Sequence, residues 1–236
     1  MNTFSIVARC ERTGELGVAV ATAVPAVGSM CPYVLAGVGA ASTQSWVNPY
    51  LAVDALARMA QGESARAALA AVLAEDPEST VRQIGLIGAR GPGVAFTGAR
   101  CTPWCGQFTG VDFAIQGNML TGEETLIAMR AVWLANPSAD LAERLMAALE
   151  AGDAAGGDMR GKQSAALKIV STEAYPLLDL RVDEHATPVA ELRRVLGVAR
   201  RQLLPFVAGM PRRSSAGIAL SGDVMAMLLK PPAERI

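Results

Sequence analysis

The sequence has few aromatic residues, a single histidine and almost no net charge. Phe, Trp and Tyr make up 5% of the chain, whereas hydrophobic residues make up 51%. The core is therefore expected to consist of Ala, Val, Leu, Ile and Met, which suits helices packed on sheets. With 21 Lys and Arg against 22 Asp and Glu, the chain has no long-range field that would attract phosphate backbones or acidic membranes. We expect neither nucleic acid nor a membrane as a partner.

Long apolar runs and a dense set of cysteines are also missing. No run reaches the roughly 18 to 20 residues that cross a bilayer, and the start of the chain does not resemble an export signal. We therefore expect a cytoplasmic protein whose cysteines, Cys10, Cys31, Cys101 and Cys105, are thiols. The spacing of Cys101 and Cys105 differs from a CxxC pair and no second pair follows, so we predict no metal site.

Hydrophobic periodicity predicts groups of strands separated by groups of helices. Strands are predicted over 3–9, 16–24, 35–42, 82–87, 94–96, 112–116, 165–170 and 177–182. Helices are predicted over 48–62, 64–76, 121–136, 139–152 and 188–203, with helical turns near 223–229. Such grouping differs from the single strand-helix alternation of a doubly wound parallel sheet. It predicts an α+β fold over 1–204, in which two stacked sheets are covered by helices as a four-layer αββα sandwich. A C-terminal tail, 205–236, is expected to follow and to pack on the domain or on a partner subunit.

Several segments resemble one protein family in their order along the chain. They are TFSIVAR at 3–9, TGELGVAVA at 13–21, PAVG at 25–28, QGNML at 116–120, AGDAAGGDMRGKQSAAL at 151–167 and LRVDEHATPVAELRRVL at 180–196. The chain resembles the uncharacterised family called domain of unknown function 1028, which is considered similar to N-terminal-nucleophile (Ntn) hydrolases. The resemblance covers 3 to about 203. It implies the fold of proteasome subunits and amidases, hydrolysis of an amide bond, and no metal or organic cofactor.

The resemblance places Thr3 at the position of the nucleophile. In such enzymes the first residue of the mature chain supplies the nucleophile, and its own α-amine, with a pKa of about 8, serves as the base. Met1 and Asn2 would have to be removed first. Because Asn is too large to favour ordinary methionine removal, self-cleavage would be required. The alternative interpretation is that Thr3 is a strand residue with high β propensity.

A glycine-flanked loop concentrates charged and polar side chains before an apolar strand. Its residues are Asp158, Arg160, Lys162 and Ser164, and glycines permit close approach to a ligand. The resemblance implies that Asp158 orients the nucleophile's amine, that Lys162 tunes it, and that Arg160 and Ser164 lie near the substrate. The alternative is an ion pair of Asp158 with Arg160 or Lys162 that fixes the loop.

Two further polar clusters lie at predicted strand ends. Gly117 and Asn118 follow a strand directly, where backbone and side-chain amides could stabilise an oxyanion. Asn118 could equally adopt a left-handed turn before the next helix. Gln44 and Asn48 are predicted to bind substrate, although Asn48 is the expected cap of the following helix. For His185, a structural or surface role is favoured over that of a general base.

Two functions follow from these patterns. The first is hydrolysis of an amide bond in a small molecule or peptide, with Thr3 as nucleophile, Asp158 and Lys162 tuning it, and Gly117 or Asn118 binding the oxyanion. Ser5 is a weaker candidate nucleophile because no base accompanies it. The alternative is a non-catalytic small-ligand-binding or scaffold protein that retains the fold. In either case we expect a homodimer or larger homo-oligomer by analogy of fold.

Overall fold

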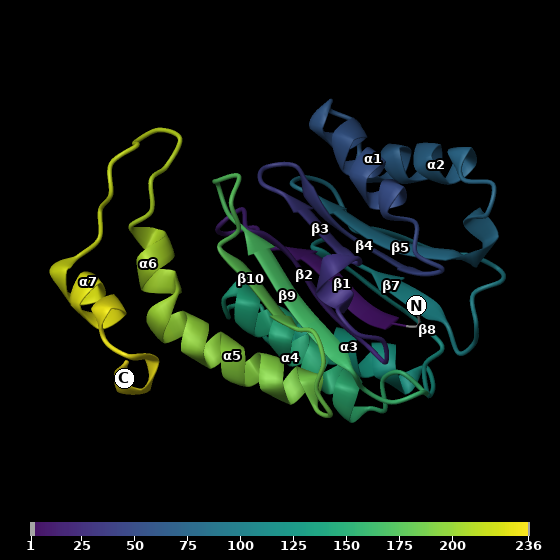
Figure 1. Cartoon of the computed structure of the whole chain (residues 1–236). Helices are drawn as coiled ribbons and strands as arrows, with labels where there is room; N and C mark the ends of the chain where they lie inside the picture. The colour runs from purple at the N-terminus through teal and green to yellow at the C-terminus, as the bar shows by residue number, and fades with distance from the viewer. Residues whose placement is uncertain (1–2, 236) are drawn as a thin grey trace.

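The computed structural model describes residues 3–235, which form two antiparallel sheets and seven α-helices (Figure 1). One sheet has the strand order β10-β9-β2-β1-β8-β7, and the other has the order β3-β4-β5-β6. The chain is therefore an α+β protein. The strands are β1 (Thr3–Arg9), β2 (Leu16–Thr22), β3 (Pro32–Leu35), β4 (Gly39–Ser45), β5 (Arg82–Gly88), β6 (Val94–Thr97), β7 (Gly106–Thr109), β8 (Phe113–Asn118), β9 (Ser164–Val170) and β10 (Leu178–Val182).

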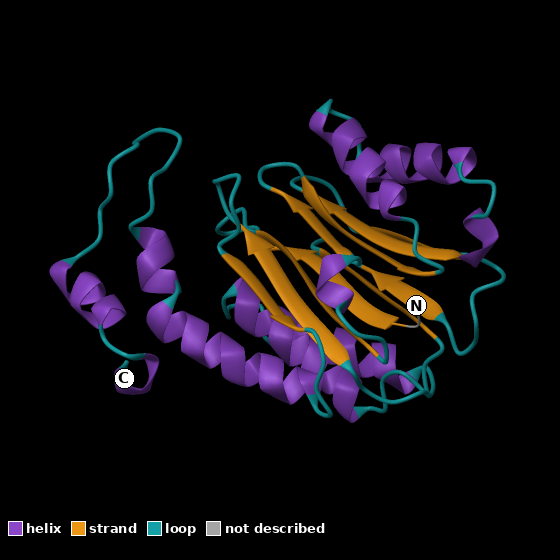
Figure 2. Cartoon of the chain, viewed as in Figure 1, coloured by secondary structure: helices purple, strands orange, loops and turns teal. Residues whose placement is uncertain are grey.

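Helices cover the outer face of each sheet, and the two sheets pack against each other (Figure 2). An apolar cluster joins α1 and α2 to the four-stranded sheet, and a larger one joins α3, α4 and α5 to the six-stranded sheet. The helices are α1 (Pro49–Ala60), α2 (Ala65–Glu75), α3 (Glu124–Ala135), α4 (Leu141–Ala154), α5 (Pro188–Gln202), α6 (Leu204–Ala208) and α7 (Gly222–Leu229). None of the described helices is long and apolar enough to span a bilayer.

The central strands are buried on both faces, so their side chains alternate between two apolar environments. In β1, Phe4 and Ile6 pack on the helices, whereas Val7 packs between the sheets with Val18 and Ile87. Every residue of β1 and of its neighbour β2 is buried. This two-sided burial explains why both segments read as nearly continuous runs of small and β-branched residues.

The structure corrects two of the sequence predictions. The segment 35–42, predicted as one strand, contains a turn that separates β3 from β4, with Gly37 in the left-handed region at a φ of 70°. The small residues of this segment suit a closely packed strand, but Gly37 serves the turn because it has no Cβ. The strand β7, Gly106–Thr109, was missed because it is short and polar. The helical turns predicted near the C-terminus are confirmed as α7.

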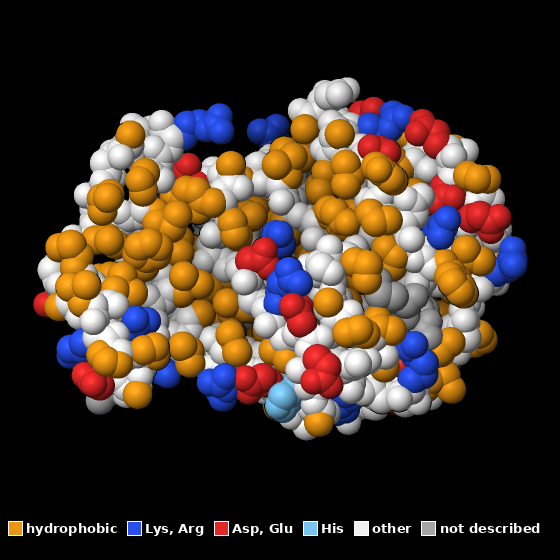
Figure 3. Space-filling view, in the orientation of Figure 1, with side chains coloured by type: hydrophobic (Ala, Val, Ile, Leu, Met, Phe, Trp, Pro, Cys, Tyr) orange, Lys and Arg blue, Asp and Glu red, His pale blue; other side chains and the backbone are white. Residues whose placement is uncertain are grey.

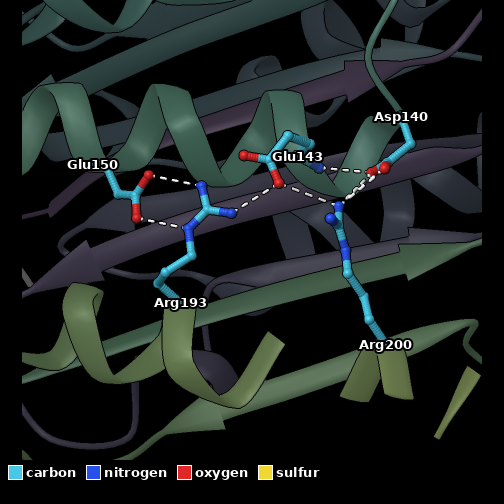
Figure 4. Close-up of polar contacts among 5 residues, drawn as sticks. All are labelled: Asp140, Glu143, Glu150, Arg193 and Arg200. Atoms are coloured by element: carbon cyan, nitrogen blue, oxygen red, sulfur yellow. Dashed lines mark hydrogen bonds and ion pairs between the residues drawn. The ribbon is translucent and has the colours of Figure 1, made fainter. Parts of the chain in front are cut away.

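Ion pairs join α5 to α4 on the outer side of the six-stranded sheet (Figure 4). Arg193 donates two hydrogen bonds to Glu150, both at 2.7 Å, and one to Glu143 at 2.8 Å. Arg200 donates to both carboxylate oxygens of Asp140, which caps the start of α4, at 2.9 Å. The Arg193 contact holds the pKa of Glu143 below its usual value. Two arginines on one face of α5 thus fix that helix across α4.

Candidate active site

Polar side chains fill one end of the space between the two sheets. Thr3 begins β1 and pairs with Asn118 at the end of β8, while Gln44 near the end of β4 pairs with Gln83 near the start of β5. All four residues are fully buried. Because neighbouring strands run antiparallel, residues distant in sequence meet at this one end. We call the buried set formed by Thr3, Ser5, Gln44, Gln83, Gln116 and Asn118 the inter-sheet polar cluster.

A chain of hydrogen bonds links the sheets through Ser5 and Gln44. The Ser5 hydroxyl accepts from Nε2 of Gln116 at 2.7 Å and donates to Oε1 of Gln44 at 2.6 Å. Nε2 of Gln44 then donates to the main-chain carbonyl of Thr3 at 3.0 Å and to Oε1 of Gln83 at 2.7 Å. The first residue of β1 is therefore held from the opposite sheet by a single side-chain amide.

Gln83 fixes the orientation of its neighbours. Its Nε2 donates to the carbonyl oxygens of Gly117 at 2.8 Å and Gly106 at 3.2 Å, and to the hydroxyl of Thr97 at 2.8 Å. The other end of the amide must therefore accept, and Nδ2 of Asn118 donates to it at 2.9 Å. This assignment leaves Oδ1 of Asn118 pointing away from Gln83.

Two buried acceptors in the inter-sheet polar cluster have no hydrogen-bond partner: Oδ1 of Asn118 and Oε1 of Gln116. An unpaired buried acceptor destabilises a fold by roughly 1–3 kcal/mol, so each such atom calls for an explanation. Asn118 lies directly across from Thr3 on the same face of the sheet, where opposed Cβ atoms are about 4.5–5.5 Å apart. The amide of Gln116 occupies the space above Gly85, where any Cβ would collide with it. Close packing thus places an open acceptor beside Thr3.

The Thr3 side chain faces the opposite sheet. Phe4 packs outward on the helices and Ser5 bonds inward to Gln44, so strand alternation directs Thr3 inward as well. Its hydroxyl donates to the hydroxyl of Thr22 on β2 at 3.3 Å, and the residue has 0% exposure. The predicted removal of Met1 and Asn2 concerns a segment that lies outside the described residues.

Asp158 forms the ion pair that was considered as its alternative role. Its side chain is 1% exposed and pairs with Arg160, whose Nη2 lies 2.9 Å from Oδ2 and whose main-chain N–H donates to Oδ1 at 2.9 Å. The main-chain N–H of Ala23, just after β2, also donates to Oδ2 at 3.1 Å. Lys162 instead pairs with Asp153 on α4 at 2.7 Å. The ion-pair interpretation is confirmed for Arg160, and Asp158 also secures the end of β2.

Ser164 closes the turn that follows β2. Its hydroxyl donates to the carbonyl of Val24 at 2.6 Å and accepts from the N–H of Val27 at 3.1 Å. Ala26 in this turn has a φ of 56°, and Ser45 and Met119 at the ends of β4 and β8 have φ values of 69° and 50°. All three lie at the polar end of the sheets. Left-handed backbone at non-glycine residues is strained and gathers at functional sites.

Other predicted site residues have structural roles. Asn48 caps α1, since its Oδ1 accepts from the N–H of Tyr50 at 3.1 Å, and its Nδ2 donates to Asp76. The left-handed turn considered for Asn118 belongs instead to Met119, because Asn118 is the last residue of β8. His185 is exposed, and its Nδ1 accepts from the N–H of Thr187 just before α5.

Sequence reasoning missed Gln83 and Gln116 as members of the cluster. Gln116 and Asn118 stand two residues apart in one strand, as do Thr3 and Ser5, so each pair shares a face. That spacing of polar residues in otherwise apolar strands was the available signal. Within 3–235, no group of three His, Cys, Asp or Glu side chains could hold a metal ion.

Comparisons with known proteins agree with the α+β architecture and place the chain in a family. A model described as a family of unknown function, DUF1028, matches residues 3–192, so the chain belongs to that family. A crystal structure of protein SPO2555 from Silicibacter pomeroyi, also of the DUF1028 family, is similar at 27% identity and a TM-score of 0.85. The match covers 94% of this chain and 100% of that one, so it extends beyond 3–192. A search of curated proteins gave no match.

Proposed function

We propose that this chain is an amide-bond hydrolase of the N-terminal-nucleophile type, built on a four-layer αββα sandwich and acting on a small molecule or peptide. The observation that carries the proposal is the position of Thr3. It begins a central strand of the six-stranded sheet, its side chain faces the opposite sheet, and Gln44 holds its carbonyl. A nucleophile at the head of an inner strand is what the resemblance to Ntn hydrolases requires.

The proposed reaction starts once Met1 and Asn2 have been removed and the α-amine of Thr3 is free. The amine takes the proton from Oγ1 as that oxygen attacks the carbonyl carbon of the scissile amide. The same proton then passes to the leaving nitrogen, and the C–N bond breaks. Water hydrolyses the resulting ester and restores the hydroxyl. An α-amine with a pKa of about 8 is suited to both proton transfers near neutral pH.

Asn118 supports this proposal in a role that differs from an oxyanion donor. Its Nδ2 is already bonded to Gln83, and the atom left open is the acceptor Oδ1. A freed amine at Thr3 carries N–H groups that this acceptor could orient. The second hydrogen on Nδ2 of Asn118 remains the proposed oxyanion donor, whereas Gly117 lies opposite Gly106 within the sheet, where strand pairing uses its main-chain N–H.

In this proposal the charged loop positions the strand beside the nucleophile and takes no part in the chemistry. Asp158 is held by Arg160 and by the N–H of Ala23, next to Thr22, which is the cross-strand partner of Thr3. Asp158 would thereby fix the strand beside the nucleophile. Lys162 lies on the same loop and is anchored to Asp153, so we assign it to the loop's geometry.

A second function, binding without catalysis, is favoured by the burial of Thr3. A side chain with 0% exposure, engaged with Thr22 and surrounded by the inter-sheet polar cluster, is closed to substrate as it stands. A chain that never loses its first two residues would retain the fold and could still bind a small ligand or serve as a scaffold.

Intact mass combined with turnover separates the two functions. The purified full chain would be weighed by mass spectrometry and assayed on a panel of acyl p-nitroanilides. We expect loss of the mass of Met1 and Asn2, turnover by that species, and no turnover by Thr3→Ala. Ser5→Ala, which removes the next inward hydroxyl, is expected to keep turnover. Turnover by the full-length mass, or by Thr3→Ala, would exclude Thr3 as the nucleophile.

A further inference from the structure

The C-terminal tail, taken here from the start of α6 to the last described residue, 204–235, leaves most of its apolar side chains uncovered. Gly209 is the only buried residue that the structure shows in it. The helix α7 has the sequence GDVMAMLL and no buried residue. Leu229 is 88% exposed, Ile218 73% and Met225 49%. In Figure 3 the tail is the left part of the molecule, where apolar side chains cover much of the visible face.

An open groove lies where the tail meets α5. It has a volume of about 320 Å³ and lies between α5, α6 and the end of the tail. Val195, Val198, Phe206 and Leu228 line it, and Arg235 stands among them. Figure 1 shows α6 and α7 beside the end of α5, away from both sheets. We call the groove together with Ile218, Met225 and Leu229 the tail surface.

The tail surface has the properties of an interface. A helix as short as α7 is not stable by itself in water, so its conformation depends on what packs against it. Contiguous apolar patches of several hundred Å² on a monomer mark interaction sites. The tail is long enough to supply the roughly 20–30 contacting residues that one side of a standard interface uses. The structural match to the relative covers 94% of this chain and so leaves fewer residues unmatched than the tail contains, which means that part of the tail recurs in that fold.

The charge distribution indicates what covers the tail surface. Residues 204–236 carry four Lys and Arg against two Asp and Glu, whereas 1–203 carry seventeen against twenty. A basic C-terminal segment and an acidic remainder attract each other between copies of one chain. A closed two-fold pair would satisfy both segments at once. A membrane surface fits less well, because α7 spans only 222–229, whereas many interfacial helices run to 20–30 residues.

We propose that two copies of this chain pair reciprocally, each packing its tail surface, with Ile218, Met225 and Leu229, on residues 1–203 of the other copy. The pairing does not depend on the proposed hydrolase activity. Because the two segments carry opposite charge, added salt is expected to weaken the pairing.

The test is the solution mass of full-length variants. Sedimentation velocity at micromolar concentration should give the mass of two chains for the unaltered protein and of one chain for Leu229→Glu and for Met225→Glu. Ile127→Glu, at an apolar residue of α3 that is 48% exposed, is the matched control and should stay dimeric. Circular dichroism of each variant should match the unaltered protein.

Three results would overturn the proposal. The first is a monomer of unaltered protein at tens of micromolar. The second is a dimer that survives both tail substitutions together. The third is sedimentation of a monomeric protein with vesicles containing phosphatidylserine but not with phosphatidylcholine vesicles, which would assign the tail surface to an anionic membrane.

Discussion

The two ends of the space between the sheets are built from different chemistry. At one end Val7, Val18 and Ile87 meet in an apolar cluster, and beyond it Arg9 donates to the carbonyls of Gly88 at 2.9 Å and Gly91 at 3.0 Å. At the other end the inter-sheet polar cluster occupies the equivalent inward positions of the same strands. The space between the sheets therefore has an apolar end, which is typical of a hydrophobic core, and a polar end, which is not.

This difference indicates that the polar end holds its side chains in fixed orientations. Apolar side chains would fill the polar end at a smaller desolvation cost, because each buried amide must find hydrogen-bond partners. A hydrogen-bonded network instead fixes each side chain in one orientation, as Gln83 does for Asn118. The left-handed residues Ala26, Ser45 and Met119 also gather there. Buried polar side chains and left-handed backbone at non-glycine residues both depart from what favours a stable fold. Such departures are expected to gather at functional sites.

The largest effect is expected at the apolar end. Ile87→Ala should lower the free energy of unfolding by about 2–5 kcal/mol, because the side chain is fully buried and its removal leaves a cavity. Urea denaturation measures this change. Ile87→Val is the matched control, with an expected loss of about 0.5–1.5 kcal/mol. Equal losses for the two variants would contradict close packing at this end.

A smaller loss is expected when the polar network is broken. Gln83→Leu keeps similar volume but leaves the carbonyls of Gly117 and Gly106 without this donor. The free energy of unfolding should fall by about 1–3 kcal/mol in the same urea experiment. Gln107→Leu removes an exposed amide that bonds the carbonyl of Ala95 and the hydroxyl of Thr97, and it should have little effect because water can replace it at the surface. A Gln83→Leu protein as stable as the parent would mean that the network contributes nothing to the fold.

Asn118→Leu should separate stability from activity. The substitution removes an acceptor that has no partner, and Gln83 keeps the hydrogen bond from Gln44. The free energy of unfolding should therefore change by less than about 1 kcal/mol. Under the proposed function, turnover should fall at least ~100-fold because the amine of Thr3 loses its orienting acceptor. A large loss of stability with unchanged turnover would reverse the assignment.

The smallest effect is expected outside both ends, at the ion pairs between α4 and α5. Arg193 lowers the folded-state pKa of Glu143, so the pair stabilises the protein above the unfolded pKa of 4.5. The contribution is lost as pH falls through the folded pKa. Glu143→Gln should therefore lower the free energy of unfolding near neutral pH by less than about 1 kcal/mol, since the side chain is 36% exposed. Thermal unfolding should show a larger difference between this variant and the parent at pH 7 than at pH 3.

Local patterns in the sequence predicted the elements and the contacts that form within short segments. The cap expected at Asn48 marks the start of α1, and the Asp158–Arg160 pair lies within one loop. The inter-sheet polar cluster depends instead on the register between strands. No local pattern indicates that Gln44 of one sheet reaches Thr3 of the other. The turn at Gly37 was missed because small residues suit a strand as well as a turn.

The central claim is that the polar end is arranged around a reactive Thr3, and covalent labelling tests it most directly. The purified chain would be treated with a β-lactone, which acylates an activated hydroxyl by ring opening, and the adduct located by peptide mass spectrometry. We expect one ester on Thr3 of chains that begin at that residue, absent in Thr3→Ala and retained in Ser5→Ala. An adduct on Ser5, or on chains that keep Met1 and Asn2, would contradict the claim.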